Sequence, residues 1–185
     1  MTGANGGIFD HLESDLEHGA TPVQSDISEG PANAGRFHNP IAARRFITAG
    51  KSTVTLESIK TGARYTYRVT RARNRDTGEP SADGTCFVGV LTGADNETAY
   101  SYLGRIAGNG VFWHGRRSPK AGDISRDAPS AKAFEWAWQK LAAGIMPDQL
   151  AVWHEGRCGR CGRKLTVPSS IESGFGPECQ GKIGL

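Results

Sequence analysis

The sequence predicts an α+β protein in which an antiparallel β-sheet meander is covered by one helix and is followed by a small cysteine-rich finger. Three observations support this fold class. Short segments between residues 46 and 114 alternate apolar and polar residues, as half-buried strands do. One segment after residue 129 has apolar residues at helical spacing. Three of the four cysteines lie after residue 157, which indicates a separate cysteine-rich unit.

Length and composition limit the number of cores. The chain has 185 residues, of which 37% are hydrophobic and 25 are glycine, so we expect one main core with a small appendage. It has no apolar run of about eighteen residues and no basic segment followed by an apolar one at the N-terminus. The sequence therefore predicts neither a membrane span nor a secretory signal. We expect a cytoplasmic protein whose thiols stay reduced.

Charge is distributed unevenly along the chain. Residues 1–35 hold six acidic residues and no lysine or arginine, whereas the rest holds all 22 basic residues and the other 13 of the 19 acids. Residues 1–45 are rich in glycine and proline, so we predict an acidic, largely disordered N-terminal arm. A basic body predicts a polyanionic partner, and the arm either competes for that surface or has its own partner.

Residues 46–150 are predicted to form the sheet-and-helix domain. Alternation on the second strand places Arg64 and Arg68 on one face and Tyr65 and Tyr67 on the other. Short glycine-rich turns between strands favour an antiparallel meander with one covered face. The expected strands are residues 52–58, 64–71, 86–91, 100–106 and 110–114.

A helix is expected to follow these strands. Ser130 is the expected N-cap, apolar residues recur at helical spacing from Ala133 to Leu141, and Gly144 ends the helix. Its aromatic side chains are bulky enough to cover the sheet. The extended stretch 150–153 then leads directly into the cysteine motif. Residues 151–185 are predicted to be a finger module that leans on the main domain.

The finger has the residues of a closed tetrahedral metal site. Cys158 and Cys161 form a C-x2-C pair, Cys179 follows, and His154 precedes the pair by four residues. A structural Zn²⁺ ion takes four such nitrogen and sulfur ligands. We therefore expect one structural Zn²⁺ per chain, held by these four residues.

The fourth ligand is open to alternatives. His154 is the nearest candidate, but His114 or Cys86 of the main domain, or a residue supplied by a partner, would also complete the site. His154 and Glu155 do not have the H-x-E spacing of a zinc deaminase. No other catalytic constellation is visible, so the sequence favours a structural ion over a catalytic one and a binding protein over an enzyme.

Glycine and proline positions indicate how the finger folds. A glycine follows each cysteine of the pair, which lets backbone N–H groups turn toward the thiolates. Pro177 suits the first turn of a helix and places Cys179 in that turn. A knuckle followed by a ligand at a helix start predicts a treble-clef-like finger. Arg163 is expected to hold the finger together, either by donating to backbone carbonyls or by reaching Glu178, rather than to contact phosphate.

The run from Cys158 to Cys179 resembles a small zinc-binding domain of unknown function found in bacteriophage and prophage proteins. Residues 61–67 and 91–104 also look like the body of such phage proteins. The resemblance implies a phage-type origin, a host-cell cytoplasmic location and zinc, and it implies no activity. The matching positions are Cys158, Cys161, Gly162, Arg163, Leu165, Pro168, Ser170, Ile171, Gly174, Gly176, Pro177 and Cys179.

Three clusters of basic residues lie beside aromatic residues: one on the hairpin, one around residues 105–120 and one in the finger. A groove for single strands needs cations for phosphates and aromatic faces for bases. The sequence thus predicts a phage-type accessory protein that binds single-stranded or structured nucleic acid through a basic sheet face. The candidate contacts are Arg64, Arg68, Arg71, Arg73, Arg105, Arg116, Arg117, Lys120, Arg157, Arg160 and Lys164.

Two other interpretations remain. Each basic cluster alone is also consistent with a solvated sheet face whose aromatic residues lie in the core. The alternative function is a protein-binding effector that inhibits a host defence or replication enzyme, with the acidic arm folding onto a basic partner. The sequence leaves the choice between nucleic acid and protein open, and the oligomeric state with it.

Overall fold

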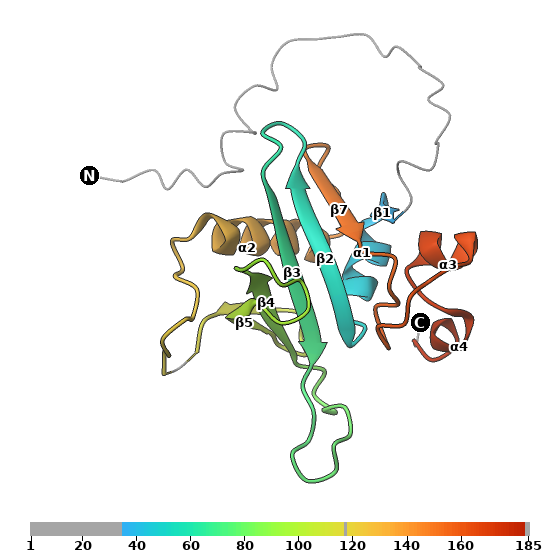
Figure 1. Cartoon of the computed structure of the whole chain (residues 1–185), viewed down its shortest axis with the longest axis horizontal. Helices are drawn as coiled ribbons and strands as arrows, with labels where there is room; N and C mark the ends of the chain where they lie inside the picture. Colours follow the sequence, from blue (N-terminus) through green and yellow to red (C-terminus); the bar gives the residue numbers. More distant parts are fainter. Residues whose placement is uncertain (1–34, 117, 184–185) are drawn as a thin grey trace.

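A computed structural model describes residues 35–116 and 118–183 of the chain. Seven antiparallel strands form one sheet in the order β1-β7-β2-β3-β4-β5-β6 (Figure 1). The predicted meander is confirmed from β2 to β6, and β7 returns to pair with β2. The strands are β1 (Arg36–Phe37), β2 (Lys51–Ser58), β3 (Arg64–Arg71), β4 (Cys86–Leu91), β5 (Tyr100–Ile106), β6 (Phe112–His114) and β7 (Leu150–His154).

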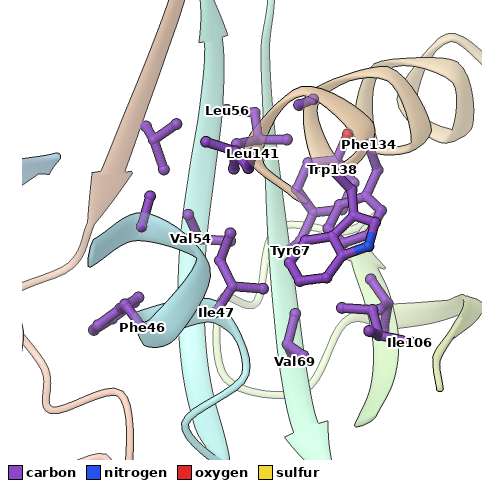
Figure 2. Packing of buried hydrophobic residues seen from close by; sticks show 14 of the residues in the cluster. Phe46, Ile47, Val54, Leu56, Tyr67, Val69, Ile106, Phe134, Trp138 and Leu141 are labelled. Atoms are coloured by element: carbon purple, nitrogen blue, oxygen red, sulfur yellow. The ribbon is translucent and has the colours of Figure 1, made fainter. Parts of the chain in front are cut away.

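Two helices, not the single predicted one, cover the same face of this sheet (Figure 2). The helix that was not predicted, α1 (Pro40–Ile47), lies largely within residues 1–45, which were expected to be disordered. Asn39 caps it by accepting from the backbone N–H groups of Ile41 and Ala42 at 2.8 and 3.1 Å. The helix is short, and burial of its apolar side against the sheet stabilises it. Residues 36–45 are therefore ordered, whereas residues 1–34 of the expected arm lie outside the described residues.

The long helix α2 (Pro129–Ala142) crosses the covered face. Its N-cap is Ala128, which gives no side-chain cap, and Pro129 occupies the first helical position, so Ser130 is not the cap that the sequence predicted. Proline suits this position because the first N–H of a helix has no intrahelical partner. The hydroxyl of Tyr67 donates to the carbonyl of Ser130 at 2.7 Å, which fixes the helix on β3.

The core lies between the helices and the sheet. Tyr67, Phe134 and Trp138 are buried there, with the Tyr67 and Phe134 rings 4.9 Å apart (Figure 2). The tyrosine side of β3 thus packs under a helix, and its arginine side lies on the opposite face of the sheet. On that open face, Phe87 and Trp113 are 44% and 55% exposed.

The finger contains two short helices, α3 (Pro168–Ser173) and α4 (Pro177–Gln180), at the side of the sheet where α1 lies (Figure 1). It docks through an aromatic cluster in which Phe46 contacts Phe37, His154 and Phe175, with ring centroids 5.1 to 5.8 Å apart. Two features of the backbone at this contact require a glycine at residue 174. Its φ is +76°, and a Cβ at this residue would lie 2.6 Å from the Phe46 ring.

The start of the finger module is shared with the sheet. Residues 151–154, which the sequence assigned to the finger, belong to β7 and pair with both β1 and β2. The chain therefore passes from a central strand into the cysteine-rich loop without a linker. Among the described helices, none is long and apolar enough to cross a membrane.

Candidate metal centre and cationic cavity

Three cysteines meet in the finger and can hold a metal ion. The sulfur atoms of Cys158, Cys161 and Cys179 all lie within 4.8 Å of one another. A Zn²⁺ ion with bonds of about 2.3 Å would hold its sulfur ligands about 3.8 Å apart, so the cluster needs only a small contraction. As expected, Pro177 begins α4 and places Cys179 in its first turn. The donor set therefore fits a thiophilic ion.

The electrostatics of the three thiols also favour a cation. Burial disfavours the thiolate of Cys158, but hydrogen bonds from the backbone of Gly176, Cys161 and Arg160 outweigh it and lower the pKa of this thiol. Burial and the two neighbouring thiols raise the pKa of Cys179, which the Arg160 side chain partly offsets. Three thiols this close cannot all ionise alone, and a bound dication removes that repulsion.

His154 is not part of the cluster, which corrects the expected fourth ligand. Its Nε2 lies 2.7 Å from the carbonyl oxygen of Ile171, and its Nδ1 accepts from the N–H of Gly156 at 3.1 Å. These contacts are satisfied together by a neutral ring that is protonated on Nε2. Both nitrogens are thus engaged. Burial lowers the pKa of this imidazole, in keeping with the neutral form. His154 thus joins β7 to α3 through these contacts and lies outside the group of three cysteines.

The remote alternatives lie in the main sheet, away from the cluster. Cys86 is buried on β4, and its thiol lies 3.8 Å from the carbonyl oxygen of Thr48. His114 is on β6, where burial lowers its pKa. Within residues 35–116 and 118–183, the metal-ligand group consists of the three cysteines alone. An ion there would take its fourth ligand from solvent, from a partner or from another part of the chain.

A large cationic cavity lies where the finger meets the end of the sheet. It has a volume of about 940 Å³ and is walled by the α1–β2 connection, the end of β3, the knuckle and the residues after α4. None of the described residues that line it is acidic. We call this site the cationic cavity, and its basic residues are Arg45, Lys51, Arg71, Arg73, Arg160 and Lys182.

Three of the basic side chains of this cavity, those of Arg45, Arg71 and Arg73, donate to backbone carbonyl groups. Arg45 donates to the carbonyl of Ile183 at 2.6 Å, and Arg73 donates to that of Gly78 at 2.8 Å. No ion pair joins any of the six to a carboxylate among the described residues. Asp83 interacts electrostatically with Arg71, but within the described residues no direct ion pair neutralises the six charges.

Several of the predicted nucleic-acid contacts are instead neutralised or engaged elsewhere. Arg64 pairs with Glu57 at 2.7 Å, and Arg116 pairs with Asp123 at 3.0 Å. The Arg68 guanidinium stacks on Tyr100 at 4.1 Å and donates to two backbone carbonyls of the β4–β5 turn. These side chains therefore already make ion pairs, ring contacts or hydrogen bonds within the fold.

The finger arginines also have partners. Arg157 lies 3.7 Å from Glu97 and donates to the Gly162 carbonyl at 3.3 Å. Arg163 reaches Glu178 at 3.9 Å, as the sequence indicated, in a pair that is 80% exposed on both sides. Such an exposed pair adds little stability.

The eleven residues predicted to contact nucleic acid therefore lie in different parts of the structure. Arg71, Arg73 and Arg160 line the cationic cavity, and Arg105 lies exposed on the open face. Lys164 lines a smaller hollow of about 430 Å³ over the cysteines. Lys120 is exposed in the connector before α2, and Arg117 lies outside the described residues.

The cavity also contains basic residues that were not expected there. Arg45, Lys51 and Lys182 come from α1, the first residue of β2 and the chain after α4. Their charges were visible in the sequence, but the fold alone brings them beside Arg71. The backbone N–H of Lys51 donates to the Gly159 carbonyl at 2.7 Å, which ties this sheet end to the knuckle.

Comparison with protein families matches residues 149–184 to a family of unknown function (DUF6011). The match covers β7 and the cysteine-rich finger, and it brings no activity with it. The curated proteins and the solved structures that were compared give no match. The sheet and its cationic cavity thus have to be interpreted from their own chemistry.

Proposed function

We propose that this chain binds nucleic acid, with the phosphate backbone entering the cationic cavity. The observation that carries the proposal is a cavity of about 940 Å³ whose walls, in the part of the chain that the structure describes, hold six basic side chains and no carboxylate. Like charges gathered in a recess repel one another and focus the local potential. A polyanion relieves that repulsion and releases its own counterions on binding.

The cavity suits a chain of phosphates better than an acidic protein surface. Arginines carry four of its six positive charges, and their planar guanidinium groups match phosphate geometry. Carbonyl contacts already orient Arg45 and Arg73, so these side chains lose less conformational entropy when they bind phosphate. A folded acidic partner would need a narrow projection to enter the recess, whereas a nucleic-acid backbone is itself narrow.

The metal in this proposal is one structural Zn²⁺ per chain, in a treble-clef-like finger of the phage type that its sequence resembles. Arg160 and Cys161 stand in the knuckle and line the cavity at the same time. Folding of the finger around an ion would therefore set the position of one cavity wall. Three thiolates and one Zn²⁺ would carry a net charge of −1, and Arg160, which donates to Cys179, would be partly neutralised by it. The other five basic residues of the cavity would then carry most of its charge toward phosphate.

The test is a titration of the zinc-loaded chain with fluorescent DNA and RNA oligonucleotides over a series of salt concentrations. We expect log K to fall linearly with log[salt], with a slope of about −2 to −4 if about three to six cations meet phosphates of a single strand. Absence of binding at low salt would rule the proposal out.

Two single variants locate the binding surface. Lys51→Gln removes an exposed cavity charge, and we expect it to weaken binding and flatten the slope by about 0.7. Arg64→Gln is the matched control, because its charge lies on the same sheet but is paired with Glu57. If Arg64→Gln weakened binding as much as Lys51→Gln, general charge rather than the cavity would be responsible.

A further inference from the structure

Five residues lie side by side across the open face of the sheet, one from each strand from β2 to β6. The register places Lys51 opposite Thr70, Thr70 opposite Phe87, Phe87 opposite Arg105, and Arg105 opposite Trp113. Neighbouring strands are about 4.8 Å apart, so the five positions span about 19 Å. We call this set the cross-strand row.

The cross-strand row is continuous with the cationic cavity. Lys51 and Thr70 line that cavity at one end of the row. Phe87 and Arg105 line a second hollow, of about 530 Å³, together with Tyr102. A ligand that leaves the cavity along the sheet therefore meets an aromatic ring, a cation and a second aromatic ring in turn.

The two rings of the row are exposed although the fold has an apolar core available. Phe87 is 44% and Trp113 is 55% exposed, and each alternates along its strand with residues that face the core. Arg105 lies between them and makes no ion pair with a carboxylate of the described residues. Two exposed ring faces on either side of an unpaired cation give stacking surfaces for bases and a contact for the phosphate between them.

We infer that the cross-strand row binds single-stranded nucleic acid, with one base stacked on Phe87, another on Trp113, and Arg105 on the intervening backbone. This inference rests on the proposed phosphate binding in the cationic cavity, and it adds a preference for single strands over duplexes. In a duplex both faces of each base are covered by neighbouring bases, so the rings of Phe87 and Trp113 cannot stack on them and add no affinity. In a single strand the base faces are free, and each stacked base strengthens binding.

The test compares single strands with duplexes on variants of the zinc-loaded full chain. The probes are an oligo-dT of about 12 nucleotides, within the length that such grooves bind, and a hairpin duplex. We expect Phe87→Ala and Trp113→Ala each to weaken oligo-dT binding about 5- to 150-fold. Because a lost ring leaves the phosphate contacts in place, hairpin affinity and the salt slope should stay as in the wild type.

Matched variants separate stacking from a general loss of apolar surface. Trp113→Phe keeps a ring and should restore oligo-dT binding to within about threefold of the wild type. Ile145→Ala removes a similarly exposed apolar side chain that lies just after α2 and outside the cross-strand row, and it should change nothing. Stacking on Trp113 should also quench its fluorescence, so the quenching of the wild type should exceed that of Trp113→Phe.

The outcomes distinguish this inference from the proposed function. If both alanine variants bind oligo-dT as the wild type does while Lys51→Gln is weakened, the row is not a stacking surface and the cavity proposal stands. If the alanine variants weaken hairpin and oligo-dT equally, the rings support general binding and strand choice is overturned. If the wild type binds neither probe at low salt, both proposals fail.

Discussion

The basic residues of this chain occupy two different electrostatic settings. On the open part of the sheet and in the connector after β6, two arginines have carboxylate partners: Arg64 pairs with Glu57, and Arg116 pairs with Asp123. In the cationic cavity, six basic side chains face a recess whose lining, among the described residues, contains no carboxylate. We propose that pairing, and not the number of charges, decides which surface of this chain binds an anion. The paired arginines have a carboxylate within the fold, whereas the cavity residues make no direct ion pair with a carboxylate of the described residues.

The largest expected effect comes from breaking the finger, which forms one wall of the cavity. Cys161→Ser should abolish stoichiometric zinc binding, because metal binding in small zinc modules supplies roughly 10 kcal/mol of folding energy. It should also unfold the segment after β7 and displace Arg160 and Lys182. Elemental analysis and circular dichroism measure the first effect, and oligonucleotide affinity measures the second.

The hairpin pair provides the control for this variant. The Arg64–Glu57 contact lies between β2 and β3 and does not involve the finger. Protection of those strand amides from hydrogen exchange should persist in Cys161→Ser. Loss of protection across the whole sheet would show that the finger supports the entire fold, and the separation of the two settings would then be wrong.

A second, smaller effect should come from His154, which holds the finger on the sheet. Burial lowers the pKa of His154 below its ordinary value of about 6.5. The unfolded chain therefore takes up a proton at higher pH than the folded chain does. Stability should be complete above about pH 6.5 and should fall toward the folded pKa, by at most about 1.4 kcal/mol per pH unit for this one group.

His154→Gln tests this role, because an amide can replace both hydrogen bonds without titrating in this range. The variant should bind zinc with wild-type stoichiometry, and its stability should vary less with pH than that of the wild type in thermal melts. Loss of the metal in His154→Gln would restore His154 as the fourth ligand and contradict the hydrogen bonding described above.

The smallest expected effect concerns the acidic residues before residue 35. All six lie in residues 1–34, so deleting this segment raises the net charge of the chain from +3 to +9. We expect oligonucleotide affinity to rise by about threefold or more at low salt and to converge with the wild type at high salt. Weaker binding after the deletion would mean that the segment contributes contacts rather than competing charge.

The strands of the meander could be predicted because their side chains alternate locally. Arg64 to Arg71 is one such segment, and its tyrosine side is the buried one. α1 was missed because it is short and follows a segment rich in glycine and proline. Its stability comes from tertiary burial of Phe46 and Ile47, which no local pattern reveals.

The cysteine cluster was predictable for the same reason, since C-x2-C spacing and Pro177 are local signals. The role of His154 was not, because its choice between metal and hydrogen bonds depends on α3, which follows it in the chain. The cationic cavity was equally hidden. Lys51 and Lys182 meet there only after β7 has returned to pair with β2 and carried the finger to the sheet end.

The most direct test of the cationic cavity is chemical-shift mapping of the zinc-loaded, ¹⁵N-labelled chain with unlabelled oligo-dT. The largest amide shifts should come from Gly50, Lys51, Arg71 and Arg160, with little change around Arg64. Shifts concentrated at the β2–β3 turn, with the cavity amides unmoved, would contradict the proposal that unpaired cations define the binding site.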